Sequence, residues 1–282
     1  MKSLKKTLNY GVLVLALLLG MMVSAIASDF TTTKLSAEQG DADAQVSIAY
    51  LYFYGDSVPQ NYQIAYEWFL KAASTKNPDA QVAIGSMYAE GKGLLQDYKK
   101  AHEWFQKAAD QGDAKAQLAI GYLYFYGNGV PQDYKKAHEW FQKAADQGEA
   151  QAQFFFGEMY YLGRNFLPSE KMGMHRVSRD YDIAYKWYLK AARQGYPDAL
   201  YTLGHMYVLG QGVEKDYKKA YDSFLSAADR GSAEAQYDLG LMYAQGLGVR
   251  QSMIKSKEWF GKSCDNGNQL GCDEYKTLHL QE

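Results

Sequence analysis

The chain of 282 residues has little net charge and few cysteines. Its 30 Lys and Arg residues are balanced by 32 Asp and Glu residues, which leaves a formal net charge of -2 at pH 7. This balance gives no electrostatic reason to expect nucleic-acid binding. Only two cysteines occur, Cys264 and Cys272, and their spacing is neither that of a C-x-x-C redox pair nor that of a metal-binding Cys/His set.

The sequence also lacks the short motifs that mark common active sites. Neither H-E-x-x-H nor G-x-S-x-G occurs. The glycine loops, such as "YGNGV", lack the strand and lysine context of a phosphate-binding loop. We therefore expect no enzymatic activity, no cofactor and no bound metal.

Long hydrophobic runs are absent apart from one at the N-terminus. Tyr10–Val23 is apolar, follows a stretch that contains three lysines, and precedes the small-x-small sequence at 25–27. This pattern predicts a signal peptide at 1–27 that is cleaved after Ala27, so that the mature chain is periplasmic or secreted. The alternative is a retained anchor, but the run of 14 residues is shorter than the ~20 needed to span a bilayer. We expect no membrane span after cleavage.

What the chain has in abundance is tyrosine and glycine, 25 and 26 residues, and both recur with a period. The seventeen residues "QDYKKAHEWFQKAADQG" at 96–112 return unchanged at 132–148. Tryptophans follow at steps of 36, 36, 47 and 72 residues, at Trp68, Trp104, Trp140, Trp187 and Trp259. Such a period is typical of stacked helix pairs. We predict a capping segment at 28–40, six repeats at 41–77, 78–112, 113–148, 149–195, 196–231 and 232–267, and a capping helix at 268–282.

Each repeat predicts two helices. In the third repeat, apolar residues recur at one face of a first helix, which contains Gly121 near its centre, and a glycine stands there in four other repeats. A glycine inside a helix costs about 1 kcal/mol relative to alanine, so we expect another backbone to approach too closely for a side chain. The second helix follows an aspartate placed to cap its free N–H groups, namely Asp97, Asp133, Asp180 or Asp216.

These residues carry a family resemblance. "AQYDLGLMYAQGLGV" at 235–249 and the whole third repeat resemble the Sel1-like repeat, a relative of the tetratricopeptide repeat with a longer glycine-containing loop. The resemblance covers about 41–267 and implies an all-α solenoid, a right-handed superhelix of antiparallel helical hairpins with an adaptor-like, protein-binding role. Cysteine-rich members bridge successive helices at the spacing of Cys264 and Cys272. An even cysteine count in an exported chain also suggests this disulfide.

The side of the first helix opposite the core differs among the repeats. Three columns spaced i, i+3 and i+7 form one stripe on each first helix. Exposed tyrosines suit protein contacts, and we predict partner binding by Tyr50, Tyr54, Glu90, Tyr122, Tyr126, Phe155, Glu158 and His205. In the alternative interpretation, the tyrosines simply pack against neighbouring repeats.

We therefore expect an exported, monomeric interaction scaffold that binds a protein partner. The resemblance suggests two versions, the neutralisation of an antibacterial effector and a virulence or host-contact role. A binder of peptidoglycan or another glycan is the first alternative. A β-lactam-binding or β-lactam-hydrolysing enzyme is the second, because cysteine-rich relatives have been linked to such compounds. A basic insert at 164–179 either clamps an acidic partner or is a tolerated loop.

Overall fold

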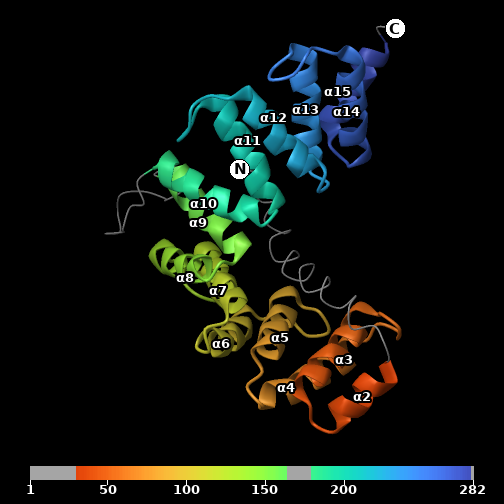
Figure 1. Cartoon of the computed structure of the whole chain (residues 1–282). Helices are drawn as coiled ribbons and strands as arrows, with labels where there is room; N and C mark the ends of the chain where they lie inside the picture. Colours follow the sequence, from red (N-terminus) through yellow and green to blue (C-terminus); the bar gives the residue numbers. More distant parts are fainter. Residues whose placement is uncertain (1–29, 164–178, 281–282) are drawn as a thin grey trace. The chain divides into compact units, whose positions relative to one another are not determined.

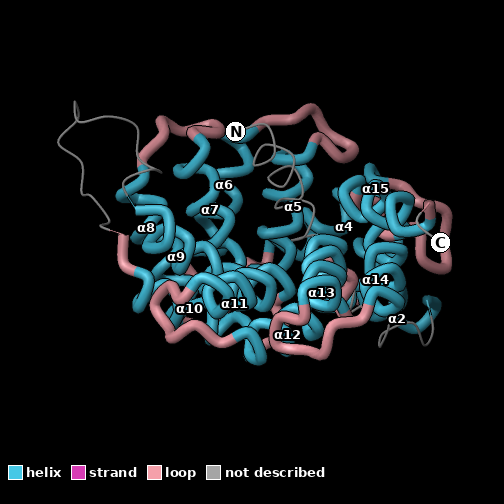
Figure 2. Tube along the Cα trace, turned by 90° about the horizontal axis from the view of Figure 1, so that it is seen from above, coloured by secondary structure: helices cyan, strands magenta, loops and turns pink. Residues whose placement is uncertain are grey.

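The computed structural model describes residues 30–163 and 179–280, which form helices and connecting loops (Figure 2). The predicted all-helical class is therefore confirmed. The proposed signal peptide and nearly all of the basic insert lie outside the described residues. Within the described ranges, no helix is both long enough and apolar enough to cross a bilayer.

The described residues form two compact units, with the boundary in the sequence between residues 144 and 145. The described part of the first unit contains α2 (Phe30–Glu38), α3 (Ala42–Tyr54), α4 (Tyr62–Ser74), α5 (Pro78–Glu90), α6 (Tyr98–Ala109), α7 (Ala114–Tyr126) and most of α8 (Tyr134–Asp146). The described part of the second unit contains α9 (Ala150–Leu162), α10 (Tyr181–Arg193), α11 (Pro197–Leu209), α12 (Tyr217–Ala228), α13 (Ala233–Gln245), α14 (Met253–Asp265) and α15 (Gln269–His279).

Helices that follow one another in the sequence pack as hairpins within each unit (Figure 1). The first helices of the six repeats are α3, α5, α7, α9, α11 and α13, and each is followed by a second helix, α4 to α14 in even numbers. At the two ends, α2 packs on α3 and α15 packs on α14. These end helices cover apolar surface that a terminal repeat would otherwise leave exposed.

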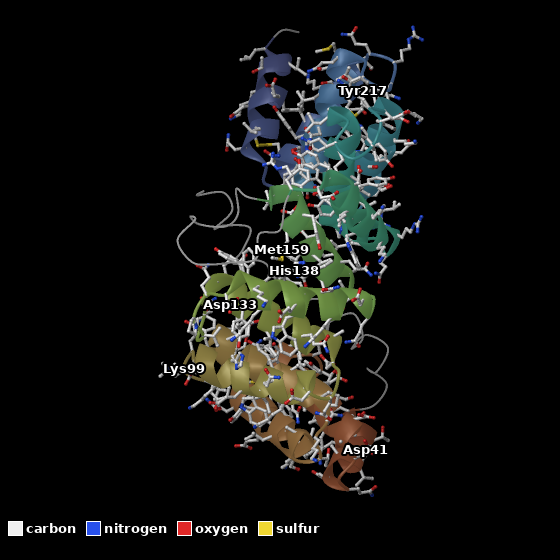
Figure 3. All side chains as sticks on the ribbon, turned by 90° about the vertical axis from the view of Figure 1, so that its left-hand side faces the viewer. Asp41, Lys99, Asp133, His138, Met159 and Tyr217 are labelled. Carbon is white, nitrogen blue, oxygen red and sulfur yellow. A yellow bond between two sulfur atoms is a disulfide. The ribbon has the colours of Figure 1, made fainter. Side chains whose placement is uncertain are left out.

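The second helices begin at the predicted capping residues. Oδ1 of Asp97 accepts hydrogen bonds from the backbone N–H groups of Lys99 and Lys100 at 3.0 and 3.1 Å. Asp133 accepts one from Lys136 at 3.0 Å; Asp133 and the exposed Lys99 are labelled in Figure 3. Asp180 and Asp216 cap α10 and α12 in the same manner. The sequence pattern therefore located these helix starts correctly.

The reason for the central glycines differs from the prediction. A Cβ atom on Gly121 would lie 2.5 Å from Cδ1 of Phe141, a ring carbon of the second helix, and not against another backbone. A Cβ atom on each equivalent glycine would likewise lie 2.4–2.9 Å from the equivalent ring, that of Phe105, Tyr188, Phe224 or Phe260. The predicted backbone approach is thus wrong. Each glycine makes room for a buried aromatic ring that joins the two helices of its hairpin.

Buried glutamines connect successive helices. In the second unit, Nε2 of Gln153 donates to the carbonyl oxygen of Ala145 at 3.2 Å, and its Oε1 accepts from Gln194 at 3.0 Å. Gln236 repeats the arrangement, donating to Ala228 and accepting from Asn266. A buried amide with both ends paired holds three helix segments in one register.

The predicted disulfide is present. Cys264 near the end of α14 is bonded to Cys272 in α15, with a Cα–Cα distance of 4.5 Å. The bond closes a short loop and attaches the last helix to the sixth repeat.

Candidate protein-binding stripes

The variable positions of each first helix lie on one helix face. Residues spaced i, i+4, i+7 and i+11 point within about 60° of one another, since each residue turns the helix by about 100°. We name these four positions the variable stripe. The stripe residues are 43, 47, 50 and 54 on α3; 79, 83, 86 and 90 on α5; 115, 119, 122 and 126 on α7; 151, 155, 158 and 162 on α9; 198, 202, 205 and 209 on α11; and 234, 238, 241 and 245 on α13.

The third stripe position contacts the second-helix ring of its own hairpin. The ring of Tyr50 meets Phe69 edge-on at 4.9 Å, and Tyr122 meets Phe141 at 5.4 Å. Tyr50 and Tyr122 are only 8% and 5% exposed. These two predicted anchors therefore belong largely to the core. The hydroxyl group of Tyr50 is buried and has no hydrogen-bond partner in the described structure.

The fourth stripe position covers the third. Tyr54 stacks on Tyr50 at 5.9 Å with 14° between the ring planes, and Tyr126 stacks on Tyr122 at 6.3 Å and 10°. Tyr54 and Tyr126 are half-buried, so each presents part of an aromatic ring whose other side is held by a buried ring. Of the four predicted tyrosines, these two are the accessible ones.

Glu90 adds a charge beside this aromatic pair in the first unit. Burial raises the pKa of Tyr54 to about 12, and the charge of Glu90 contributes to the shift. Oε2 of Glu90 lies 2.7 Å from Nζ of Lys92. Its Oε1 is buried without a hydrogen-bond partner among the described residues. Tyr54 and Glu90 thus combine an accessible ring with a carboxylate.

The fourth repeat, in the second unit, exchanges the usual residue types. Glu158 stands where the first and third repeats have tyrosine, and Tyr188 stands where the other second helices have phenylalanine. The phenol of Tyr188 donates a hydrogen bond to Glu158. Burial raises the pKa of Glu158 to about 7; the bond from Tyr188 opposes the shift, and the charge of Asp198 adds to it. Met159, the neighbour of Glu158, marks α9 in Figure 3.

His205 in the fifth repeat faces the sixth. Its Nε2 lies 3.0 Å from Oδ2 of Asp238, and its ring contacts Phe224 edge-on at 5.1 Å. The side chain of Tyr201 also forms a hydrogen bond with Asp238. His205 is thus held between the core ring of its own hairpin and a carboxylate of the next repeat.

Gln151, Tyr196 and Asp198 form a hydrogen-bonded group at the start of the stripes of α9 and α11 in the second unit. The side-chain amide of Gln151 donates to the phenol of Tyr196, and this phenol donates to Asp198. Partial desolvation raises the pKa of Asp198, the bond from Tyr196 lowers it, and the charge of Glu234 raises it. Neither Tyr196 nor Asp198 was among the predicted site residues, since both precede the columns that the sequence comparison defined.

The structure therefore groups the predicted residues by unit. Tyr54 and Glu90 interact in the first unit, and Glu158 and His205 occupy the same stripe position on α9 and α11 in the second. Phe155 is half-buried beside Phe154, with 5.2 Å between the ring centroids.

A shallow cleft of about 580 Å³ lies away from the stripes, along the ends of α4 and α6. Trp104, Lys107 and Leu70 are among its lining residues. Nζ of Lys107 lies 3.7 Å from the centre of the Trp104 ring. The face of the one aromatic ring among these lining residues is therefore already in contact with a cation of the same chain.

Hairpins with a common core and a variable stripe define a helical-repeat scaffold. A family model for the Sel1 repeat matches residues 42–74, 78–113, 114–149, 150–196, 197–232 and 233–268. These segments make up most of the chain, which therefore belongs to the Sel1 repeat family.

Solved structures of this family share the fold. A protective antigen of uropathogenic Escherichia coli with an SLR fold is 33% identical, with a TM-score of 0.75 over 90% of this chain and 52% of that chain. This chain thus spans about half the length of that antigen. A Sel1 repeat protein of Oxalobacter formigenes is 32% identical, with a TM-score of 0.72 over 80% of this chain and 88% of that chain.

A more distant likeness concerns the fold alone. An immunity protein of Pseudomonas aeruginosa is 21% identical, with a TM-score of 0.51 over 81% of this chain and 83% of that chain. No curated protein sequence matches the chain.

Proposed function

We propose that the chain is an exported, non-enzymatic scaffold that binds a protein partner through the variable stripes of its first helices. The observation that carries the proposal is the contrast between a repeated core and a changing stripe. The core rings and central glycines recur from hairpin to hairpin, whereas the stripe residues differ from one first helix to the next. Export rests on the signal-peptide pattern of residues 1–27.

The half-buried tyrosines are the proposed anchors in the first unit. Tyr54 and Tyr126 are each stacked on a buried ring, so little side-chain freedom remains to be lost when a partner covers them. Large rings with one polar end dominate the energetics of many protein interfaces.

Affinity capture from cell-envelope extract tests the proposal. The chain without residues 1–27 is the bait, beside the double variants Tyr54→Ala/Tyr126→Ala and Lys99→Ala/Lys135→Ala. The lysines are an equivalent pair of exposed residues on second helices. We expect a stoichiometric protein partner with the wild type and the lysine variant, and affinity at least about 10-fold lower with the tyrosine variant. Equal capture by all three would contradict the stripe assignment.

The finer hypothesis concerns the class of partner. An immunity protein shares the fold, and the antigen at 33% identity comes from a pathogen, so an antibacterial effector and a host protein are the two classes to compare. Co-expression in bacteria separates them, because an effector is toxic alone and harmless beside the chain. Sedimentation with isolated cell wall tests the glycan alternative, and turnover of a chromogenic β-lactam would contradict the non-enzymatic role.

A further inference from the structure

The second unit carries carboxylates on three successive variable stripes. We name Glu158 on α9, Asp198 on α11, and Glu234 and Asp238 on α13 the acidic face. The stripes of these three helices contain no lysine or arginine, and His205 is their one basic side chain. The first unit differs, since Lys115 lies on the stripe of α7.

Asp198 is close enough to Glu158 and to Glu234 for their charges to interact. The charge of Asp198 raises the pKa of Glu158, and the charge of Glu234 raises the pKa of Asp198, in each case in addition to desolvation. No lysine or arginine of the described residues offsets either shift. Around Glu158, Asp198 and Glu234, negative charge therefore accumulates without a lysine or arginine that offsets it, which is unfavourable in a partly desolvated site.

A separate observation points to a missing hydrogen-bond donor. Gln151 is 1% exposed and reaches the acidic face through Tyr196, which bonds Asp198. Its Oε1 is buried and has no hydrogen-bond partner within the described ranges. A buried acceptor left without a donor is unfavourable, so a donor that reaches this oxygen beside Tyr196 would recover the loss.

The chemistry of the surrounding groups selects the donor. Carboxylates and an amide oxygen accept hydrogen bonds, and an ammonium or guanidinium group only donates them. The rings of Tyr196 and Tyr201, each bonded to one of the carboxylates, offer π faces that attract a cation. We propose that the acidic face of the second unit binds a protonated lysine or arginine side chain of the protein partner. This proposal rests on the scaffold function above and names the chemistry of one contact.

Nuclear magnetic resonance with short peptides tests the contact directly. The ¹⁵N-labelled chain without residues 1–27 is titrated at low ionic strength with acetyl-Gly-Gly-Arg-Gly-Gly-amide, with its lysine counterpart, and with its citrulline counterpart, which keeps the shape of arginine without the charge. We expect saturable amide shifts on α9, α11 and α13 with arginine, lysine or both. We expect none with citrulline. The relative affinities decide between guanidinium and ammonium.

Two isosteric double variants separate the site from bulk charge. Glu158→Gln/Asp198→Asn neutralises the acidic face, and Glu214→Gln/Glu258→Gln neutralises two exposed residues elsewhere in the second unit. We expect the first variant to bind the cationic peptide about 10-fold more weakly and the second to match the wild type. Equal weakening by both variants, shifts outside α9, α11 and α13, or binding of citrulline would overturn the proposal.

The outcome is independent of the capture experiment. If a protein partner is captured equally well by the wild type and the Glu158→Gln/Asp198→Asn variant, the scaffold function stands and the cation contact is refuted. If the peptide titration succeeds while no protein is captured, the scaffold function fails instead.

Discussion

Replacement of Glu158 by glutamine should stabilise the protein, and the gain should depend on pH. The glutamine side chain matches the protonated glutamate in size and keeps an oxygen that accepts the hydrogen bond from Tyr188. It cannot ionise. The comparison therefore isolates the free energy that the folded protein loses when Glu158 becomes charged.

The pKa shift determines the magnitude and the sign. Glu158 rises from the ordinary value of 4.5 to about 7 in the folded state. Below pH 4.5 the carboxyl is protonated in both folded and unfolded chains, so it contributes no pH dependence there. Between 4.5 and 7 the unfolded chain loses the proton first, and the stability of the wild type falls. Above pH 7 the full shift corresponds to about 3 kcal/mol, an upper limit because the side chain retains some solvent access.

Urea unfolding measured by circular dichroism and tryptophan fluorescence checks this expectation. At pH 8, Glu158→Gln should exceed the wild type by about 2–3 kcal/mol. At pH 5 the difference should shrink to about a quarter of that value, because few wild-type chains are then ionised in the folded state. Glu258→Gln, which alters an exposed glutamate on α14, should remain within about 0.5 kcal/mol of the wild type at both pH values. A variant no more stable at pH 8, or equally stabilised at pH 5, would refute the reasoning.

Three further predictions concern the core and the end of the chain. Tyr188→Phe should raise the pKa of Glu158 further, by up to about one unit, because it removes the donor that stabilises the charged form; a ¹³C carboxyl titration that finds an unchanged or lower pKa would count against this. Gly121→Ala should destabilise by about 1–3 kcal/mol in urea unfolding, since its Cβ would lie 2.5 Å from the Phe141 ring; helix propensity alone predicts the opposite sign, a gain of about 1 kcal/mol. Cys272→Ser should lower the free energy of unfolding by about 2–3 kcal/mol, because it removes a cross-link between residues 8 apart. Amide hydrogen exchange should become faster in α15, with a smaller change in α9 and α11.

The helices could be predicted from the sequence because their signals are local. A capping aspartate lies within three residues of the N–H groups that it binds, as Asp97 does with Lys99 and Lys100. The period of the tryptophans located the hairpins for a similar reason, since each repeat carries its own complete pattern. The disulfide could also be predicted, because the two cysteines are only 8 positions apart in the sequence.

The contacts between helices were less accessible to sequence reasoning. The central glycine shows that something approaches the first helix, but one sequence does not state whether that is a backbone or a ring. Glu158 and Tyr188 are 30 residues apart, and the insert of the fourth repeat hides their equivalence to Tyr122 and Phe141. The sequence offers one signal, since Tyr188 stands where the other second helices have phenylalanine. That signal points to Glu158 only once the structure shows that the Tyr188 hydroxyl reaches the third stripe position.

The stripe therefore varies for two different physical reasons, and only one of them concerns a partner. At the third position a side chain must fit the ring beneath it: Tyr50 and His205 do so by edge-on contact, and Glu158 does so by accepting a phenolic hydrogen bond. Substitution there changes the stability of a hairpin first and binding second. The fourth position at Tyr54 is less constrained, because the ring is half-buried and stacks on Tyr50 with one side. The first position at Asp198 is exposed. If partner selectivity lies in the stripes, changes at Asp198 should alter affinity while leaving the unfolding free energy nearly unchanged. Changes at Tyr54 should alter affinity more than the unfolding free energy, and changes at the third position should alter both.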